Sequence, residues 1–371
     1  MLEALFRLIC EEFKLKGEYV GYDIIKAGNI NDTYVITTII GECKKKYIIQ
    51  RINTAVFKEP KQIASNVQLV TSHIEKKLIE QGDKEVKRKV VRIYKNKKGG
   101  CFYISENGDY WRVLSYVYNS VNYSQATNSV LKAAGEAFGT FQRLLQDFPA
   151  EKLYTTIPDF HNTEKRFAAL NEAAQRDPYG RKQEVLAELE YLLSREEYAS
   201  RFRVLHEMGE MPYRVTHNDT KCNNVMFDLN TDAPLAVIDL DTVMPGFVAH
   251  DFGDAVRFAA NTAEEDEEDL SKVSLDLNKY ECFACGFIPQ VFDMVTKTEL
   301  ESLPDGVIIM ALELAARFLT DYLNGDTYFK CKKPKHNLLR AKCQIALAKD
   351  IEAKLPEMHA RLARFVPVAK Y

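Results

Sequence analysis

The sequence predicts an α+β protein of two lobes, an antiparallel β-sheet with one inserted helix followed by a mostly helical part. Short apolar runs between turn residues dominate residues 1–118, whereas apolar residues recur at helical spacing through most of residues 119–371. A pair of short apolar runs at 225–238 interrupts the helical part. Because no low-complexity linker separates them, we expect the domains 1–118 and 119–371 to be tightly joined.

The first lobe begins with an amphipathic helix in MLEALFRLICEEFKLKG. A strand–loop–strand signal follows, in which the polar segment KAGNINDT lies between two apolar runs, and another strand is predicted over 45–52. From Pro60 the spacing changes to that of one helix face, carried by Ile63, Val67, Val70, Ile74 and Leu78. Further strands are predicted over 90–94, 101–105 and 110–118, and Asn107–Gly108 indicates a hairpin.

The second lobe reads as helical on both sides of the apolar pair at 225–238. Leu131, Ala134, Phe138, Phe141 and Leu145 define one helix face, and a charged helical region covers 163–207. Helices resume after the pair and continue to the end.

Composition excludes several classes of partner. Fifty basic and fifty-three acidic residues give a net charge of −3, so we expect neither a nucleic acid nor an anionic membrane as partner. No signal peptide or apolar run of membrane-spanning length is apparent, which predicts a cytoplasmic protein. The eight cysteines are scattered with a single C-x-x-C, a pattern of reduced thiols rather than of zinc binding. No feature suggests an obligate protein partner.

Residues 217–241 carry the chemistry of the sequence. His217, Asp219 and Asn224 precede a short apolar run, turn residues and a second run follow, and Asp239 comes next. A hairpin brings its outer ends together, so we expect a carboxamide and two carboxylates to meet there. These oxygen ligands suit Mg²⁺, and a carboxylate beside them suits a general base, which together is the chemistry of phosphoryl transfer.

HNDTKCNN, which starts at His217, resembles the H-x-D-x-x-x-x-N catalytic loop of the protein-kinase-like fold. Spacing then predicts that Asp219 accepts the proton of the attacking hydroxyl and that Asn224 and Asp239 hold Mg²⁺. Lys221 is expected to reach the γ-phosphate of ATP. The alternative is an Asx turn before a strand, with no catalytic role.

Asp251 follows Asp239 by only twelve residues. A protein-kinase activation segment with its peptide platform does not fit in that interval, and neither D-F-G nor A-P-E occurs at the expected places. A small-molecule hydroxyl is therefore preferred to a protein substrate.

VTHNDTKCNNVMFD and VIDLDTVMPGFVAHDFGDAVRF resemble the aminoglycoside phosphotransferase and choline kinase superfamily. The resemblance implies that Asp251, with His217, supports the catalytic loop. Asp241 matches the second acidic position of the superfamily motif I-D-F-E, which implies that Asp241 contributes to the metal site.

Longer segments resemble the N-acetylhexosamine 1-kinases, namely GNINDTYVITT, YIIQRIN, HNDTKCNNVM, IDLDTVMPG and RFLTDYLNGDTYFK. This resemblance implies an ATP- and Mg²⁺-dependent kinase that phosphorylates the anomeric hydroxyl of N-acetylglucosamine or N-acetylgalactosamine. It further implies that residues 1–118 cover the nucleotide and that Arg317 and Tyr328 contact the sugar beside Asp219.

The expected nucleotide loop departs from the protein-kinase pattern. No G-x-G-x-x-G is present, and Gly28, Asn29 and Asn31 supply the turn, whose backbone N–H groups can face phosphates. An ordinary hairpin turn is the alternative.

Arg51 stands where the fold has a basic residue on the next strand, and we expect it to bind phosphate. Strand alternation puts it on the face of Ile49, where adenine is expected. Its carboxylate partner stays open between Glu59 and Glu75, and the strand from Trp111 to Tyr118 is expected to contact adenine.

Glu313, Arg317 and Asp321 form a polar stripe on an otherwise apolar helix, either as a solvated face or as part of a binding cleft. The acidic run 264–269 is expected to be solvated. Alternative functions are a kinase of choline, homoserine or an aminoglycoside, or a nucleotide-binding pseudokinase. The last is disfavoured because Asp219, Asn224 and Asp239 are all present.

Overall fold

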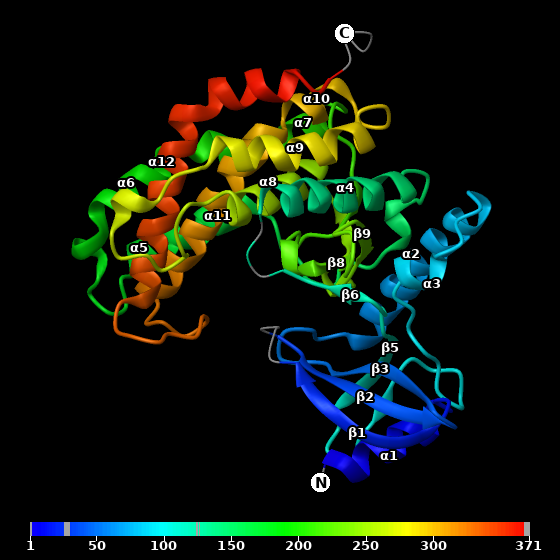
Figure 1. Cartoon of the computed structure of the whole chain (residues 1–371). Helices are drawn as coiled ribbons and strands as arrows, with labels where there is room; N and C mark the ends of the chain where they lie inside the picture. The colour runs from blue at the N-terminus through cyan, green and yellow to red at the C-terminus, as the bar shows by residue number, and fades with distance from the viewer. Residues whose placement is uncertain (1, 26–29, 124, 126, 367–371) are drawn as a thin grey trace. The chain divides into compact units, whose positions relative to one another are not determined.

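A computed structural model gives the structure of residues 2–25, 30–123, 125 and 127–366 (Figure 1). The chain divides into two units, each of which is described separately below. Unit 1 comprises Met1–Val121, Glu151–Ile157 and Met226–Met244, and unit 2 comprises Asn122–Ala150, Pro158–Val225 and Pro245–Tyr371. The predicted α+β class, an antiparallel sheet followed by a helical part, is confirmed. The functional roles of residues 1–118 and 119–371 stay predictions.

Unit 1 is built on a five-stranded antiparallel sheet of order β1-β2-β3-β5-β4. Its strands are β1 (Glu18–Ile25), β2 (Asp32–Ile40), β3 (Cys43–Arg51), β4 (Tyr103–Ile104) and β5 (Tyr110–Ser115). The predicted hairpin turn lies between β4 and β5, where Gly108 has a φ of 83°. The strand expected over 90–94 forms only an isolated bridge between Ile93 and Leu114.

The N-terminal helix α1 (Leu2–Glu12) packs on one face of this sheet. Phe6 is fully buried and meets Tyr34 and Trp111 with ring centroids 5.0 and 5.9 Å apart. Because β3 alternates, Ile49 faces this cluster while Gln50 points to the opposite face. One face of the sheet is thus apolar and covered by α1, whereas the opposite face carries the polar pair Gln50–Arg112 beside the apolar row Val35, Ile48 and Leu114.

The rest of unit 1 consists of α2 (Pro60–Glu80), α3 (Val86–Lys89) and a small sheet of order β6-β8-β9. The strands of that sheet are β6 (Ser120–Val121), β8 (Val225–Asp228) and β9 (Pro234–Val237). The hairpin predicted over 225–238 is thus confirmed. Its turn is organised by Asp228, whose Oδ1 accepts hydrogen bonds from the backbone N–H groups of Asn230 and Thr231. The single turn η4 (Leu240–Thr242) follows β9.

Unit 2 is mainly helical. Its longer helices are α4 (Asn128–Leu144), α5 (Thr163–Arg176), α7 (Glu196–Glu207), α8 (Val248–Ala259), α9 (Leu277–Val291), α11 (Leu303–Leu323) and α12 (His336–Ala363). Shorter segments are η1 (Ala150–Lys152), η2 (Lys182–Val185), α6 (Leu186–Leu193), β7 (Arg214–Thr216), η3 (Cys222–Asn224), β10 (Met244–Gly246), η5 (Leu270–Lys272) and α10 (Lys297–Glu301). The strands β7 and β10 pair with each other.

The buried helix α11 is the centre of unit 2, and α5, α8 and α12 pack against it. α8 approaches it at two glycines: a Cβ at Gly253 would meet the carbonyl of Gly306, and a Cβ at Gly306 would meet that of Ala249. Only glycine permits this backbone contact. The two helices therefore pack backbone to backbone at this point.

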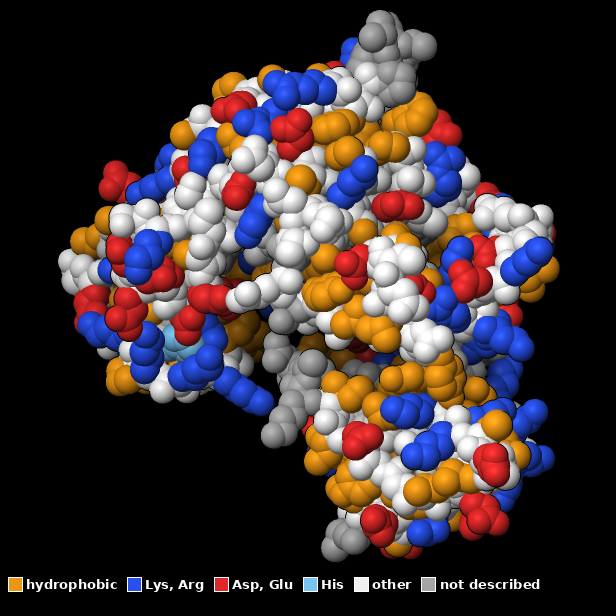
Figure 2. Space-filling view, in the orientation of Figure 1, with side chains coloured by type: hydrophobic (Ala, Val, Ile, Leu, Met, Phe, Trp, Pro, Cys, Tyr) orange, Lys and Arg blue, Asp and Glu red, His pale blue; other side chains and the backbone are white. Residues whose placement is uncertain are grey.

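The surface shows no large field of one charge on the face seen in Figure 2, where basic and acidic side chains alternate. The acidic run 264–269 is paired with a basic segment: Asp266 contacts His336, Glu268 contacts Lys333, and Glu265 lies 3.8 Å from Arg340. Among the described residues, no helix is long and apolar enough to cross a membrane.

Candidate functional site

The loop that follows β7 holds Asp219 by both carboxylate oxygens. Its Oδ1 lies 2.8 Å from the Lys221 ammonium, and its Oδ2 accepts a hydrogen bond of 3.1 Å from the Asn224 amide. The same amide nitrogen donates to the Asp219 carbonyl at 2.9 Å. The side chain is 27% exposed, so the carboxylate is fixed in orientation yet accessible. That combination suits a group that must meet a substrate hydroxyl in one geometry.

Asp251, in the first turn of α8, holds this loop through hydrogen bonds to its backbone. Its two carboxylate oxygens accept the backbone N–H groups of His217 and Asn218 at 2.8 and 2.7 Å. Asn218 has a φ of 64°, a left-handed conformation that Asn tolerates better than most residues. Burial raises the pKa of Asp251, while these N–H donors and the amide of Gln142 favour its ionised form. The contacts expected of a supporting aspartate are therefore present.

His217 is fully buried below the loop, with its ring 5.5 Å from that of Phe138 and 6.0 Å from that of Phe141. Its Nδ1 accepts the backbone N–H of Asp219 at 3.3 Å. The ring thus packs in an aromatic pocket and fixes the backbone of the loop at Asp219.

Lys221 lies between the partly exposed carboxylate of Asp219 and the buried charges of Asp254 and Arg257. Burial disfavours its ammonium, yet the charges of Asp219 and Asp254 outweigh that penalty and raise the pKa of Lys221. Asp254 is also paired with Arg257 at 2.8 Å, one turn along α8. Although burial opposes ionisation, Arg257 and Lys221 together lower the pKa of Asp254. Lys221 is therefore held charged beside Asp219.

His161 connects the loop to α11. One ring nitrogen, Nε2, lies 3.2 Å from the Asn218 carbonyl, and the other, Nδ1, lies 3.1 Å from Glu313 Oε1. Both partners are acceptors, so only the protonated ring can donate to both at once. Burial opposes this charge, but Glu313 raises the pKa of His161, and the pKa of Glu313 falls to about 2 beside it despite its own burial. His250, next to both, stays neutral because burial and the charge of His161 lower its pKa to about 3.

The polar stripe of α11 is buried at two of its three positions. Glu313 and Asp321 are 1% and 5% exposed, so the interpretation as a solvated face does not hold for them. Asp321 accepts the backbone N–H groups of residues 327, 328 and 329 and thereby shapes the loop that carries Tyr328. The Tyr328 side chain is exposed, and the Arg317 guanidinium lies 5.5 Å from the ring centroid of Phe329.

In unit 1, Asp239 ends the hairpin and has a left-handed backbone, with φ 59° and ψ 53°. Asp241 is buried and forms a bidentate ion pair with the buried Arg112 of β5, at 2.6 and 2.9 Å. Gln50 Oε1 accepts two further hydrogen bonds from the same guanidinium. Asp241 thus forms a salt bridge, and this pairing competes with the metal-binding role expected for its carboxylate.

The nucleotide loop is described only at its end. Gly28 and Asn29 lie outside the described residues. The Asn31 amide donates to Asp241 Oδ2 at 2.8 Å, and its oxygen accepts the backbone N–H of Asn53. Two residues that the sequence assigned to different parts of the site, Asn31 and Asp241, are therefore in contact.

The Arg51 side chain does not take part in this contact between Asn31 and Asp241. It alternates onto the face of Ile49 as predicted, but α1 fills that face, which conflicts with the expectation that adenine lies there. Its guanidinium pairs with Asp32 at 2.8 Å and lies 3.6 Å from Asp109, and the side chain is 45% exposed. The helix carboxylate Glu75 pairs with Arg92 instead of Arg51.

The donor set can be compared with what Mg²⁺ requires. In the described part of the chain, no three His, Cys, Asp or Glu side chains form a ready-made cluster. Mg²⁺ in phosphoryl-transfer sites takes one or two carboxylates together with phosphate oxygens and water, so such a cluster is not needed. Asn224 directs its amide nitrogen to Asp219, which leaves its carbonyl oxygen on the other side as the ligand atom.

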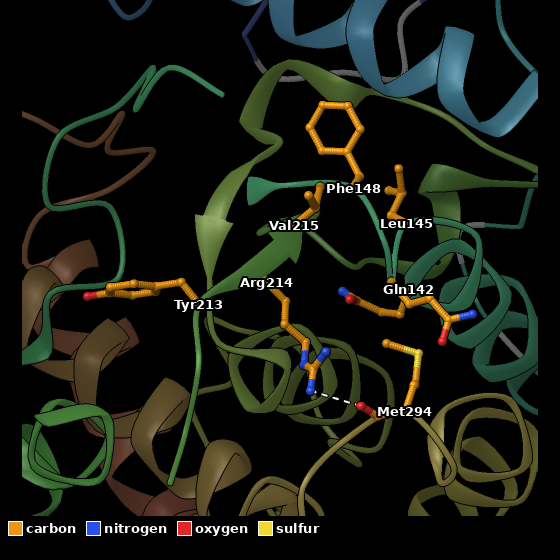
Figure 3. Close-up of a pocket in the computed structure, with 8 residues that line it drawn as sticks. Gln142, Leu145, Phe148, Tyr213, Arg214, Val215 and Met294 are labelled. Atoms are coloured by element: carbon orange, nitrogen blue, oxygen red, sulfur yellow. Dashed lines mark hydrogen bonds between the residues drawn. The ribbon is translucent and has the colours of Figure 1, made fainter. Parts of the chain in front are cut away.

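A cavity of about 60 Å³ lies next to β7 and is lined by Gln142, Arg214 and Met294 among others (Figure 3). Arg214 donates to the Met294 carbonyl at 2.9 Å and is paired with Glu299. The volume holds a few water molecules and no nucleotide or sugar. The cavity adjoins Gln142, the hydrogen-bond partner of Asp251, and is too small to be the substrate site.

Several residues around the site were missed from the sequence. Asp254 had a local signal, since it follows Asp251 by one helical turn within HDFGD. Arg112 and His161 had none, because their partners Asp241 and Glu313 are 129 and 152 residues away.

Comparison with known proteins agrees with this geometry. Residues 22–280 match the phosphotransferase enzyme family, abbreviated APH. Among solved structures, the chain is similar to the choline kinase of Cryptosporidium parvum Iowa II, with a TM-score of 0.60 and 13% identity over 100% of this chain and 99% of that one. The microcompartment-associated aminopropanol kinase gives 0.59 and 15% over 97% and 99%.

The ethanolamine kinase of Plasmodium vivax gives a TM-score of 0.53 and 14% identity, over 87% of this chain and 82% of that one. At these identities the likeness establishes the protein-kinase-like fold and nothing finer. The family match covers well over half of the chain, including the loop at Asp219 and the hairpin that ends at Asp239. On these grounds, the chain belongs to the phosphotransferase enzyme family.

Proposed function

We propose that this protein is an ATP- and Mg²⁺-dependent kinase that phosphorylates the anomeric hydroxyl of N-acetylhexosamines, in the cytoplasm. The observation that carries the kinase assignment is the fixed carboxylate of Asp219, held by Lys221 and Asn224 in a loop that Asp251 braces. The sugar assignment rests on the segments that resemble the N-acetylhexosamine 1-kinases. The short interval between Asp239 and Asp251 supports a small acceptor.

In this mechanism Asp219 orients the sugar hydroxyl and takes its proton as the oxygen attacks the γ-phosphate. Lys221 stabilises the charge of the transferred group, and its pKa, raised by Asp219 and Asp254 against the effect of burial, keeps it protonated at neutral pH. Asn224 and Asp239 would hold Mg²⁺, which when bound neutralises phosphate charge. Most of the acceleration then comes from positioning and electrostatic stabilisation.

The nucleotide side is proposed from unit 1. Gly28, Asn29 and Asn31 would cover the phosphates, with Asn31 anchored to Asp241. Arg112 would act as a positioning residue that fixes the segment after Asp239. For Arg51, the ion pairs with Asp32 and Asp109 make phosphate binding the less favoured of its possible roles.

The test is acceptor-dependent ADP formation by the wild type and Asp219→Asn, with Asp276→Asn as matched control. Asp276 caps α9 through its side chain, and Asn serves equally well at that position. Loss of the general base should lower kcat by about 10²–10⁴-fold without changing the melting temperature. Near-normal turnover of Asp219→Asn would show that another group is the base.

A second candidate is a kinase of amino alcohols, favoured by the names of the similar solved structures. Such acceptors carry a cationic nitrogen, for which aromatic cages or clustered carboxylates are the usual receptors. Acidic residues 265, 266 and 268 are paired with basic side chains, which argues against this run as such a receptor. Choline and ethanolamine belong in the acceptor panel as direct competitors of N-acetylglucosamine.

A further inference from the structure

Arg166 on α5 and Arg317 on α11 lie close to a contact that joins these two helices. Thr163 Oγ1, in the first turn of α5, donates to Glu313 Oε2 at 2.8 Å. Near the other ends, Arg176 donates to Asn324 Oδ1 at 3.2 Å, so the helices run in the same direction. Arg166 and Arg317 each follow the Thr163–Glu313 contact by one turn. Their guanidinium groups therefore belong to one region of unit 2.

Arg166 has an unused donor in this region. Its Nη2 donates to the carbonyls of Asp159 and Phe160 at 2.8 and 3.2 Å. Its Nε is buried, and no described residue accepts a hydrogen bond from it. A buried donor left unpaired is unfavourable and rare in native proteins, so this one calls for a functional or structural explanation.

The charges around Arg166 are not balanced. Burial and the positive charge of Arg317 both lower the pKa of Arg166, while Glu313, Tyr328 and Asp159 oppose that effect. Glu313 is already committed, since its two oxygens accept hydrogen bonds from His161 and Thr163. Asp159 is likewise paired, with Lys165, so neither carboxylate is left to neutralise Arg166 and Arg317 alone.

The region adjoins the catalytic loop. His161, two residues before Thr163, contacts the carbonyl of Asn218, the residue that precedes Asp219. The start of α5 is therefore held against the loop that carries the proposed base. A group bound at Arg166 and Arg317 would belong to the molecule that receives the phosphoryl group.

We propose that Arg166 and Arg317 form a subsite for an uncharged oxygen acceptor of the substrate, such as the carbonyl of an acetamido group. The subsite selects by charge, because two guanidinium groups repel a cationic acceptor and offer N–H donors to an oxygen. This proposal rests on the proposed kinase function and extends it by assigning Arg166 as a specificity residue.

The test compares two pairs of acceptors that differ in N-acetylation: N-acetylglucosamine with glucosamine, and N-acetylethanolamine with ethanolamine. The amines are cationic at neutral pH. For the pair that is phosphorylated, the wild type should favour the acetylated member by about tenfold or more in kcat/KM, the scale of one charge-assisted hydrogen bond. Arg166→Gln should raise KM for that member about tenfold, and Arg166→Glu should shift the preference towards the amine.

Arg317→Gln serves as a second variant with the same expected direction, should Arg166 variants fold poorly. Arg176→Ala is the control, since Arg176 is 60% exposed in the last turn of the same helix. A wild-type preference for the amine, or a ratio that neither Arg166 nor Arg317 variants alter, would overturn the subsite while leaving the kinase function standing. Absence of any acceptor-dependent ADP formation would instead reject the proposed function, and the subsite with it.

Discussion

At the scale of single residues, the buried His161 ring connects the loop that carries Asp219 to α11. It donates to a carbonyl next to Asp219 and to a carboxylate of α11, and neutral histidine can satisfy only one of these acceptors. The charged groups facing it are Glu313 from α11 and Asp254 from α8, with neutral His250 beside them. Loss of its proton would therefore loosen the backbone before Asp219.

This contact predicts a pH dependence of stability. Because Glu313 raises the folded-state pKa of His161, its stabilisation is complete below the unfolded-state pKa of about 6.5 and is lost as pH rises through the folded-state pKa. Glu313, with a folded-state pKa of about 2, contributes above its ordinary value of 4.5 and loses that contribution as pH falls. Urea unfolding of the wild type and His161→Gln at several pH values measures both limbs.

The wild type should lose stability on the alkaline side more steeply than His161→Gln, which has no proton to lose there. If the free energy of unfolding changed with pH in parallel for the two proteins, groups other than His161 would cause the loss of stability at high pH.

The sequence offered no hint of the pair His161–Glu313, because a single histidine in a polar segment is not distinguishable from a surface residue. The H-x-D-x-x-x-x-N loop, by contrast, was predictable because the residues of the motif itself lie within eight positions of the sequence.

At the scale of elements, the segment after β9 is fastened to the sheet and to α2. Arg112 of β5 binds Asp241, and the amide of Asn66, on α2, donates to the carbonyl of Val243 at 3.0 Å. Asn31 adds a contact from the end of the nucleotide loop. Asp239 therefore starts a segment whose position depends on three elements of unit 1.

Removing one member of the buried ion pair Arg112–Asp241 should lower the stability of the fold. Arg112→Ala leaves the carboxylate of Asp241 buried without its partner and should lower the free energy of unfolding by about 3–5 kcal/mol. The double variant Arg112→Met with Asp241→Leu should recover much of that loss while kcat stays low. Chemical denaturation and turnover of both variants provide the measurement, with Arg51→Ala as a control in an exposed ion pair.

If Arg112→Ala were as stable as Arg51→Ala, the ion pair Arg112–Asp241 would not stabilise the segment after β9.

The comparison of these arginines also shows what could not be predicted from the sequence. Alternation correctly placed Arg51 on the face of Ile49, but which face α1 covers depends on packing between distant segments. The hairpin at 225–238 and the helix from Pro60 were predictable because turn residues and apolar spacing are local signals.

At the scale of the whole molecule, the metal is expected to serve the reaction and not the fold. Mg²⁺ at phosphoryl-transfer sites is held largely by substrate phosphates and water, so we expect the fold of the nucleotide-free protein not to depend on it. Excess EDTA should therefore abolish turnover without changing the circular dichroism spectrum or the melting temperature of the nucleotide-free protein. Adding Mg²⁺ back should restore the rate; turnover that persists in EDTA would contradict the proposed role of the cation.

The central claim is tested most directly by phosphorus NMR of the product formed from ATP, Mg²⁺ and N-acetylglucosamine. We predict a phosphate signal split by one proton, the anomeric one, because the phosphoryl group is transferred to the anomeric oxygen. The splitting should vanish on proton decoupling, and the signal should be missing with Asp219→Asn. A phosphate coupled to two methylene protons, or product only from choline or ethanolamine, would contradict the account.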